Sequence, residues 1–214
     1  MENTTQKIAQ TLLNIQAVGF KLAEPITFKS GLKSPVYVDN RRLPFFPEEW
    51  TLVIEGFREL ITLNSLDFDI IAGIETAGIP HSAALGFLLK KPSVFVRKQV
   101  KDHGTKKRVE GGQVEGKRVL LIEDHITTGG SSLSGVEALR AEGGIVTDCL
   151  AITSYEFPNS KTVFAEAGVQ PHTLTSFAVI LEEAVKSGAI PADALATVED
   201  WFTEQKGWAG RHGF

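Results

Sequence analysis

The chain has 214 residues, enough for one substantial α/β domain, and its 22 basic against 26 acidic residues leave a net charge of −4. This charge predicts no nucleic-acid partner, so an anionic ligand would have to be bound by local basic residues. The single cysteine, Cys149, excludes an internal disulfide and favours a reducing compartment. With no apolar leader and no run approaching ~18 apolar residues, we expect a cytoplasmic protein without a membrane span.

The first 45 residues differ in pattern from the rest. Apolar residues at helical spacing predict an amphipathic helix over residues 4–18 that ends near Gly19. Residues 20–42 mix β-type residues with proline, glycine and several cations, which predicts short antiparallel strands or ordered loop. We interpret residues 1–45 as a hood over a core of residues 46–214, within one structural domain; a solvated hairpin is the alternative.

From residue 47 onward, strands and helices alternate. Pro47 opens a helix, and apolar strands are predicted at 68–74, 93–97, 119–123, 145–155 and 172–176. Helices are predicted at 81–89, 131–142, 159–167 and 177–187, and a last helix from Pro191 precedes a glycine-rich tail, GWAGRHGF. This alternation predicts an α/β fold with a central, mainly parallel sheet covered by helices on both faces. Ligands of such sheets bind at the carboxyl ends of the strands.

The most specific motif is VLLIEDHITTGGSS, from Val119 to Ser132. A buried strand leads to Glu123 and Asp124, and a turn of threonine, glycine and serine then opens a helix. The turn offers backbone amides, hydroxyls and the positive end of a helix dipole to a phosphate, but it lacks the lysine of a Walker loop. Because acids would repel that phosphate, they are expected to bind ribose hydroxyls, or Mg²⁺. The motif predicts a ribose 5-phosphate ligand; solvated acids in an ordinary turn are the alternative.

A second candidate is the basic segment at 97–112, RKQVKDHGTKKRVEGG. Seven of its sixteen residues are basic: Arg97, Lys98, Lys101, His103, Lys106, Lys107 and Arg108. It is long for a connection inside a compact domain, and its charge suits a lid that closes over a polyphosphate. A solvated basic loop is the alternative. A turn at 74–80, IETAGIP, could offer amides to a further phosphate group, but the segment alone favours a plain turn.

These strings resemble those of type I phosphoribosyltransferases. The acidic pair followed by TTGGS is similar to their signature for phosphoribosyl pyrophosphate (PRPP). Three further strings, FKSGLKSPVYVDNRR, AGIETAGIPH and VRKQVKDHG, resemble the orotate phosphoribosyltransferases in order and spacing, over roughly residues 8–190. The resemblance implies the type I phosphoribosyltransferase fold, transfer of ribose 5-phosphate from PRPP to orotate in UMP biosynthesis, a requirement for Mg²⁺, and a homodimer.

The resemblance also implies roles for individual residues. Lys101, His103 and Asp124 are expected to act in catalysis, with the lid reaching into the neighbouring subunit's site. The residues expected to bind PRPP are Arg97, Lys98, Lys101, His103, Glu123, Asp124, His125, Ile126, Thr127, Thr128, Gly129, Gly130 and Ser131. Those expected to bind orotate are Thr127, Lys29 and Tyr37. Mg²⁺ is expected to be held mainly through PRPP, with no direct protein ligand.

The chain departs from the family pattern at three places. His125 stands where an apolar residue is common, and Glu75 replaces a small residue before Thr-Ala-Gly. Residues 153–156 contain no arginine, whereas many members use one there to bind the orotate carboxylate. Lys29 or backbone amides of the hood would then bind it. Two alternatives stay open: a phosphoribosyltransferase for another base, and a non-catalytic sensor of PRPP or a nucleotide on the same fold.

Overall fold

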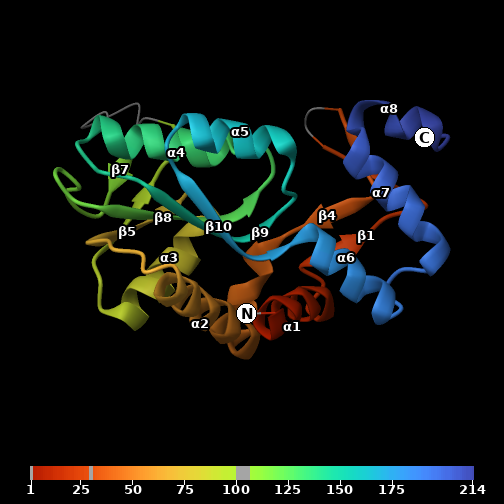
Figure 1. The fold of residues 1–214 in the computed structure, drawn as a ribbon, viewed down its shortest axis with the longest axis horizontal. Helices are drawn as coiled ribbons and strands as arrows, with labels where there is room; N and C mark the ends of the chain where they lie inside the picture. Colours follow the sequence, from red (N-terminus) through yellow and green to blue (C-terminus); the bar gives the residue numbers. More distant parts are fainter. Residues whose placement is uncertain (1, 29–30, 100–106) are drawn as a thin grey trace.

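A six-stranded sheet forms the centre of the molecule in the computed structural model, which describes residues 2–28, 31–99 and 107–214 (Figure 1). Its strand order is β10-β9-β8-β5-β6-β7, and every neighbouring pair is parallel except β6 with β7. The strands are β5 (Ile70–Ile74), β6 (Ser93–Val96), β7 (Val109–Glu110), β8 (Val119–Ile126), β9 (Asp148–Ser154) and β10 (Gln170–Ser176). The predicted, mainly parallel sheet is confirmed; the antiparallel edge strand β7 is an addition.

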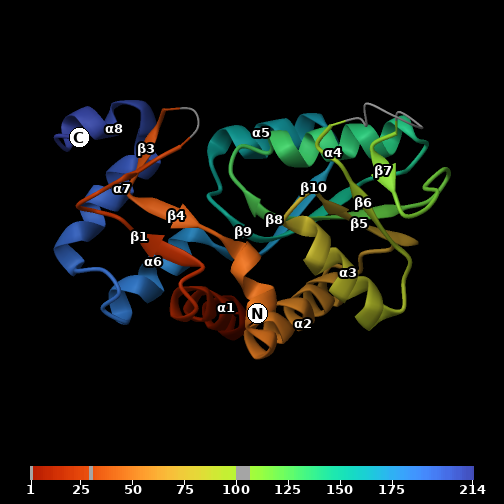
Figure 2. The same ribbon diagram turned by 180° about the vertical axis from the view of Figure 1, so that it is seen from behind.

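Helices cover both faces of this sheet, as predicted. On one face lie α4 (Gly130–Ala141) and α5 (Pro158–Glu166), and on the other α1 (Glu2–Asn14), α2 (Pro47–Leu63) and α3 (Gly78–Leu89) (Figures 1 and 2). Successive residues of β8 point to opposite faces, so Leu121 joins one apolar cluster and Leu120 the other. In the part of the chain that the structure describes, no helix combines the length and apolarity needed to cross a membrane.

The N-terminal segment forms two small antiparallel two-stranded sheets after α1. Helix α1 ends at Asn14, earlier than predicted, because Gln16 takes a left-handed conformation (φ 56°) that stops the helix. The chain then forms β1 (Val18–Phe20), β2 (Ile26–Thr27), β3 (Lys33–Ser34), β4 (Val36–Val38) and the 3₁₀ helix η1 (Asn40–Phe45). Strand β1 pairs with β4, and β2 with β3. The short antiparallel strands agree with the prediction; the division at residue 45 stays a prediction.

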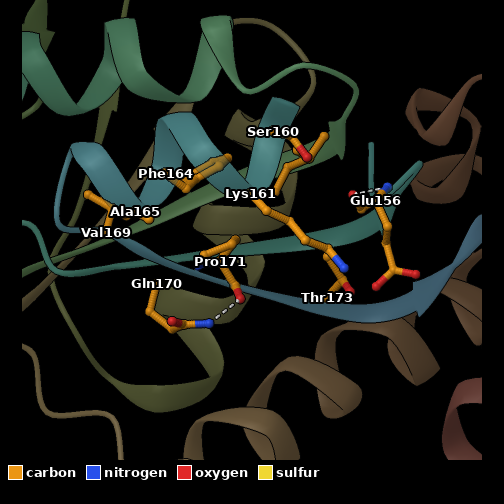
Figure 3. A pocket seen from close by; sticks show the side chains of 11 residues that line it. Glu156, Ser160, Lys161, Phe164, Ala165, Val169, Gln170, Pro171 and Thr173 are labelled. Carbon is orange, nitrogen blue, oxygen red and sulfur yellow. Dashed lines mark hydrogen bonds between the residues drawn. The ribbon is translucent and has the colours of Figure 1, made fainter. Parts of the chain in front are cut away.

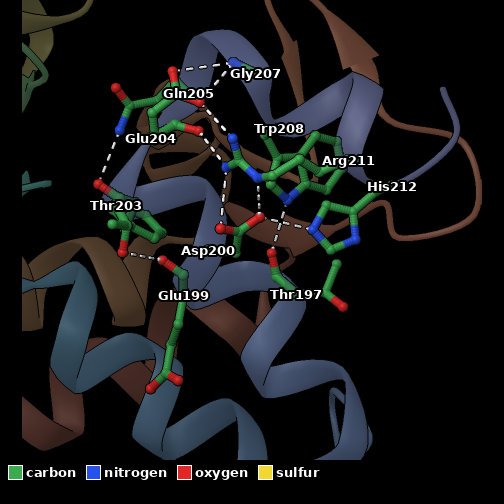
Figure 4. A network of polar contacts seen from close by, with 11 residues as sticks. Thr197, Glu199, Asp200, Thr203, Glu204, Gln205, Gly207, Trp208, Arg211 and His212 are labelled. Atoms are coloured by element: carbon green, nitrogen blue, oxygen red, sulfur yellow. Dashed lines mark hydrogen bonds and ion pairs between the residues drawn. The ribbon is translucent and has the colours of Figure 1, made fainter.

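The last residues are helical, so the predicted glycine-rich tail is wrong. After α6 (Phe177–Lys186) come η2 (Ala192–Ala194), α7 (Leu195–Thr203) and α8 (Gln205–Arg211). Tertiary contacts stabilise α8 despite its glycines: Trp208 is fully buried and donates to the Thr197 carbonyl at 2.8 Å, and Arg211 pairs with Asp200 (Figure 4). The indole of Trp201 donates to the Lys33 carbonyl at 3.0 Å, which joins α7 to β3.

Candidate active site

Both acids lie within β8: Glu123 as predicted, and Asp124 inside the strand rather than after it. The predicted strand ended at residue 123, but β8 continues to Ile126 because β9 runs beside it, pairing His125 with Thr153. The structure therefore corrects the end of this strand by three residues. The acidic pair remains at the carboxyl end of a central parallel strand, as the sequence indicated.

Burial dominates the electrostatics of the acidic pair. Glu123 is 5% exposed, and its Oε1 accepts the backbone N–H of Asp124 at 3.1 Å. Loss of water, followed by the charge of Asp124, raises the pKa of Glu123 to about 8, although a bond with Ser131 opposes this shift. Burial also raises the pKa of Asp124, and the positive charge of Arg41 is among the influences that oppose it. The pair therefore holds a proton near neutral pH. A ligand that stabilises the ionised form would have to displace that proton.

The loop after β8 has the geometry of an anion site. Thr127, Thr128, Gly130 and Ser131 are exposed, and α4 begins at Gly130. The preceding residue, Gly129, has a φ of 86° and no side chain that could cap the helix. A Cβ there would also lie 3.0 Å from the Phe164 ring, so a larger residue would disturb the loop. The exposed hydroxyls of Thr127 and Thr128 and the first amides of α4 are therefore placed to meet a phosphate, whereas the Ser131 side chain also bonds to Glu123.

The described part of the basic segment begins and ends on adjacent strands. Arg97 follows β6, its backbone N–H donates to the Arg108 carbonyl at 2.9 Å, and its side chain donates to Glu110 at 3.2 Å. Strand β7 thus closes the segment, which the sequence did not predict. Lys98 is exposed, whereas Lys101 and His103 lie outside the described residues.

Glu75 has a structural role at the base of this segment. Its Oε2 accepts the backbone N–H of Lys98 at 2.9 Å. The contact is possible because β5 and β6 are parallel neighbours whose ends, Ile74 and Val96, are paired. The carboxylate that could have repelled a pyrophosphate therefore joins the turn after β5 to the start of the basic segment.

His125 points into the fold. Its Nδ1 lies 2.8 Å from the Thr153 hydroxyl, and its ring packs edge-on against Tyr155 at a centroid distance of 4.3 Å. Burial lowers the pKa of His125 to about 4, so the ring is neutral at physiological pH. A contact between PRPP and this residue stays a prediction. The imidazole already contacts Thr153 and Tyr155.

Two residues of η1 reach the acidic pair and were not assigned a role from the sequence. The fully buried Asn40 donates from Nδ2 to the Asp124 carbonyl at 2.9 Å and to the Thr153 hydroxyl at 3.1 Å. Arg41 follows, and its charge interacts with the Asp124 carboxylate. In the sequence, the one sign that this segment could reach the site was the cluster of cations in FKSGLKSPVYVDNRR.

The residues expected to contact orotate are only partly described. Lys29 lies outside the described residues. Tyr37 on β4 donates its hydroxyl to the Gln16 carbonyl at 3.1 Å, and its ring lies against Gly19 of β1. These contacts are with the hairpin itself, and stacking of Tyr37 on a base stays a prediction.

Two cavities lie near the end of the sheet, and neither is lined by Glu123 or Asp124. One, of about 370 Å³, lies between α5 and β10; Ile126 and Ser154 contribute to it, and Lys161 extends over it toward Thr173 (Figure 3). The other, of about 600 Å³, lies between α6 and α7; apolar residues such as Tyr155 and Phe177 line it, together with the charged residues Glu156, Glu182, Lys186 and Glu199. Across the described ranges, no three histidine, cysteine or acidic side chains gather as metal ligands. The acidic pair is thus identified by its chemistry rather than by an enclosed cavity.

Comparison with known proteins decides the family. A family model described as the phosphoribosyl transferase domain matches residues 52–163. An orotate phosphoribosyltransferase of Coxiella burnetii is 41% identical over 206 residues, which are 96% of this chain and 99% of that relative. The chain belongs to the orotate phosphoribosyltransferase family. The resemblance seen in the sequence is confirmed, and so is the type I phosphoribosyltransferase fold.

Solved structures agree with this membership. The orotate phosphoribosyltransferase of Aeropyrum pernix has a TM-score of 0.74 at 30% identity, covering 85% of this chain and 99% of that one. The UMP synthase of Leishmania donovani has a TM-score of 0.80 at 26% identity, covering 94% of this chain and 42% of that one. Residues 153–156 contain no basic side chain, and two of them, Thr153 and Tyr155, are buried.

Proposed function

We propose that the protein transfers ribose 5-phosphate from PRPP to orotate, giving orotidine 5′-monophosphate and pyrophosphate. The observation that carries this proposal is the pair of the buried Glu123 and the half-buried Asp124 at the end of β8, directly before exposed hydroxyls and the uncapped start of α4. The names of curated relatives that match nearly the whole chain support orotate as the base. The step belongs to the formation of UMP.

The proposed chemistry needs no protein nucleophile. The N1 atom of orotate forms a bond to C1′ as the bond from C1′ to pyrophosphate breaks, through a state with oxocarbenium character. Glu123 and Asp124 accept hydrogen bonds from the ribose hydroxyls and stabilise the positive charge that develops on the sugar. The loop from Thr127 to Ser131 binds the 5-phosphate. Arg97, Lys98, Lys101 and His103 stabilise the departing pyrophosphate.

We further propose that the reaction depends on Mg²⁺ and takes place in the cytoplasm. When bound, mainly through PRPP, the ion would neutralise pyrophosphate charge, and the hard carboxylate oxygens of Glu123 and Asp124 are chemically suited to it. The buried thiol of Cys149 suits a reducing compartment, although it does not require one.

A homodimer is the proposed assembly. Phe45 on η1 and Phe87 on α3 are 83% and 90% exposed, and both segments pack against α2. An exposed apolar patch is typical of an interface, and these two side chains are the ones proposed to lie in it. The Phe87→Glu variant should lower the mass measured by light scattering from dimer to monomer, and turnover should fall if the lid is shared. Ile145→Glu, which alters an exposed apolar residue beside β9, is the control and should stay dimeric.

The decisive test of the reaction is pyrophosphate release from PRPP and Mg²⁺ with four bases in parallel: orotate, uracil, hypoxanthine and xanthine. We expect turnover with orotate alone, and loss of that turnover in the Asp124→Asn variant. Turnover with uracil or a purine but not with orotate would refute the assignment of the base. Binding of PRPP without turnover on any of the four would favour the non-catalytic sensor.

A further inference from the structure

The start of η1 is attached to the end of the ribose-binding strand. Asn40 is 0% exposed, and its amide nitrogen bonds to both the Asp124 carbonyl on β8 and the Thr153 hydroxyl on β9. These two bonds join segments that lie 84 and 113 residues apart in the chain. A buried, doubly bonded amide has little freedom to move, so the position of the next residue, Arg41, relative to Asp124 is well defined.

The guanidinium of Arg41 is oriented and accessible. Its Nε donates to Asp39 Oδ1 at 2.5 Å, while its side chain is 67% exposed. Within residues 2–28, 31–99 and 107–214, that ion pair is its one recorded bond, which leaves the two terminal nitrogens for a ligand. The planar fork of an arginine matches a carboxylate through two parallel hydrogen bonds.

The strand after the PRPP loop offers no such group. Residues 153–156 read Thr-Ser-Tyr-Glu, without a basic side chain. Tyr155 is 9% exposed and packs against His125 and Phe177. The next residue, Glu156, is acidic and would repel a carboxylate. A positive group for the base must therefore come from another element.

The chemistry of the substrate indicates where that group must lie. Orotate carries its carboxylate on C6, the ring atom next to N1, and N1 is the atom that bonds to C1′ of the ribose. The carboxylate therefore lies beside C1′ of the sugar whose hydroxyls are assigned to Glu123 and Asp124. A cation that binds it should be a neighbour of this acidic pair.

We propose that Arg41 binds the carboxylate of the base and so selects orotate over uracil. This inference rests on the proposed function, because it assumes that a carboxylated pyrimidine meets the ribose at Asp124. Asp39 orients the guanidinium, and Asn40 fixes the backbone from which it extends. The role that many relatives give to an arginine after the PRPP loop is then supplied from η1.

A binding cycle tests this role. Orotidine 5′-monophosphate and UMP differ only in the carboxylate, so calorimetry of both ligands with wild type and Arg41→Gln isolates the interaction between that group and residue 41. We expect wild type to prefer orotidine 5′-monophosphate. Arg41→Gln should weaken that ligand about 10- to 100-fold and change UMP affinity by less than about threefold. Arg41→Lys, which keeps the charge without the fork, should be intermediate.

The control is Arg42→Gln, which changes the adjacent cation, whose guanidinium lies 6.0 Å from the Phe46 ring centroid. It should leave the preference between the two nucleotides unchanged. Retained UMP binding shows that Arg41→Gln is folded. Equal weakening of both nucleotides by Arg41→Gln, or the same loss in Arg42→Gln, would refute the inference. If the wild-type protein does not convert orotate at all, the proposed function fails, and the inference fails with it.

Discussion

The raised pKa of Glu123 predicts that PRPP binding expels a proton. Below a pKa of about 8, the carboxyl of the free protein is mainly protonated, because burial and the neighbouring Asp124 disfavour its charge. In the proposed complex, ribose hydroxyls and Mg²⁺ would stabilise the ionised form instead. PRPP should therefore bind more tightly as the pH rises toward 9, and each binding event at lower pH should release a proton.

The expected change in PRPP affinity with pH follows from this pKa. At pH 7 only about one molecule in ten has an ionised Glu123, so the apparent affinity should be about tenfold weaker than at pH 9. The number of protons released per PRPP should fall as the pH rises through about 8.

Calorimetry in buffers of different ionisation enthalpy measures the released protons directly. The Glu123→Gln variant is the matched control, because any proton it releases comes from PRPP or from other groups. Identical proton release by the two proteins, or affinity that does not change between pH 7 and 9, would refute the reasoning. Unfolding provides a second measurement. Since the folded-state pKa is raised, wild type should lose stability relative to Glu123→Gln as the pH rises from about 4.5 to 8.

Three further predictions follow. Lys101→Ala should reduce turnover on the order of 10²-fold with little change in PRPP affinity, and near-normal turnover in a steady-state assay would contradict the lid. Asn40→Ala leaves the Asp124 carbonyl without this partner and should cost about 1–3 kcal/mol, seen as a Tm lower by about 2–4 °C for each kcal/mol; an unchanged Tm would contradict it. Burial lowers the pKa of His81 and His125 to about 4, so below pH 6.5 the unfolded chain binds protons that the folded one does not. Denaturant unfolding from pH 6.5 to 4 should therefore show a shallower loss of stability in His125→Val than in wild type, and equal slopes would count against a neutral buried ring.

Local sequence predicted most of the architecture because periodicity depends on residues close together in the chain. The apolar run before Glu123 and the helical pattern after Ser131 indicated the strand, the loop and α4. The same reasoning failed for α8, whose glycines favour a loop. That helix depends on the burial of Trp208 and on the ion pairs of Arg211, neither of which local propensity includes.

The sequence by itself determined the class of ligand, the family and the succession of strands and helices along the chain, since a phosphate site needs particular residue types at short spacing. Only the tertiary structure decided which distant residues meet. It brought Glu75 to the Lys98 amide, turned His125 onto Thr153, and placed Asn40 and Arg41 beside Asp124. Such contacts depend on strand register and on how the N-terminal segment packs across the strand ends, and no local pattern encodes either.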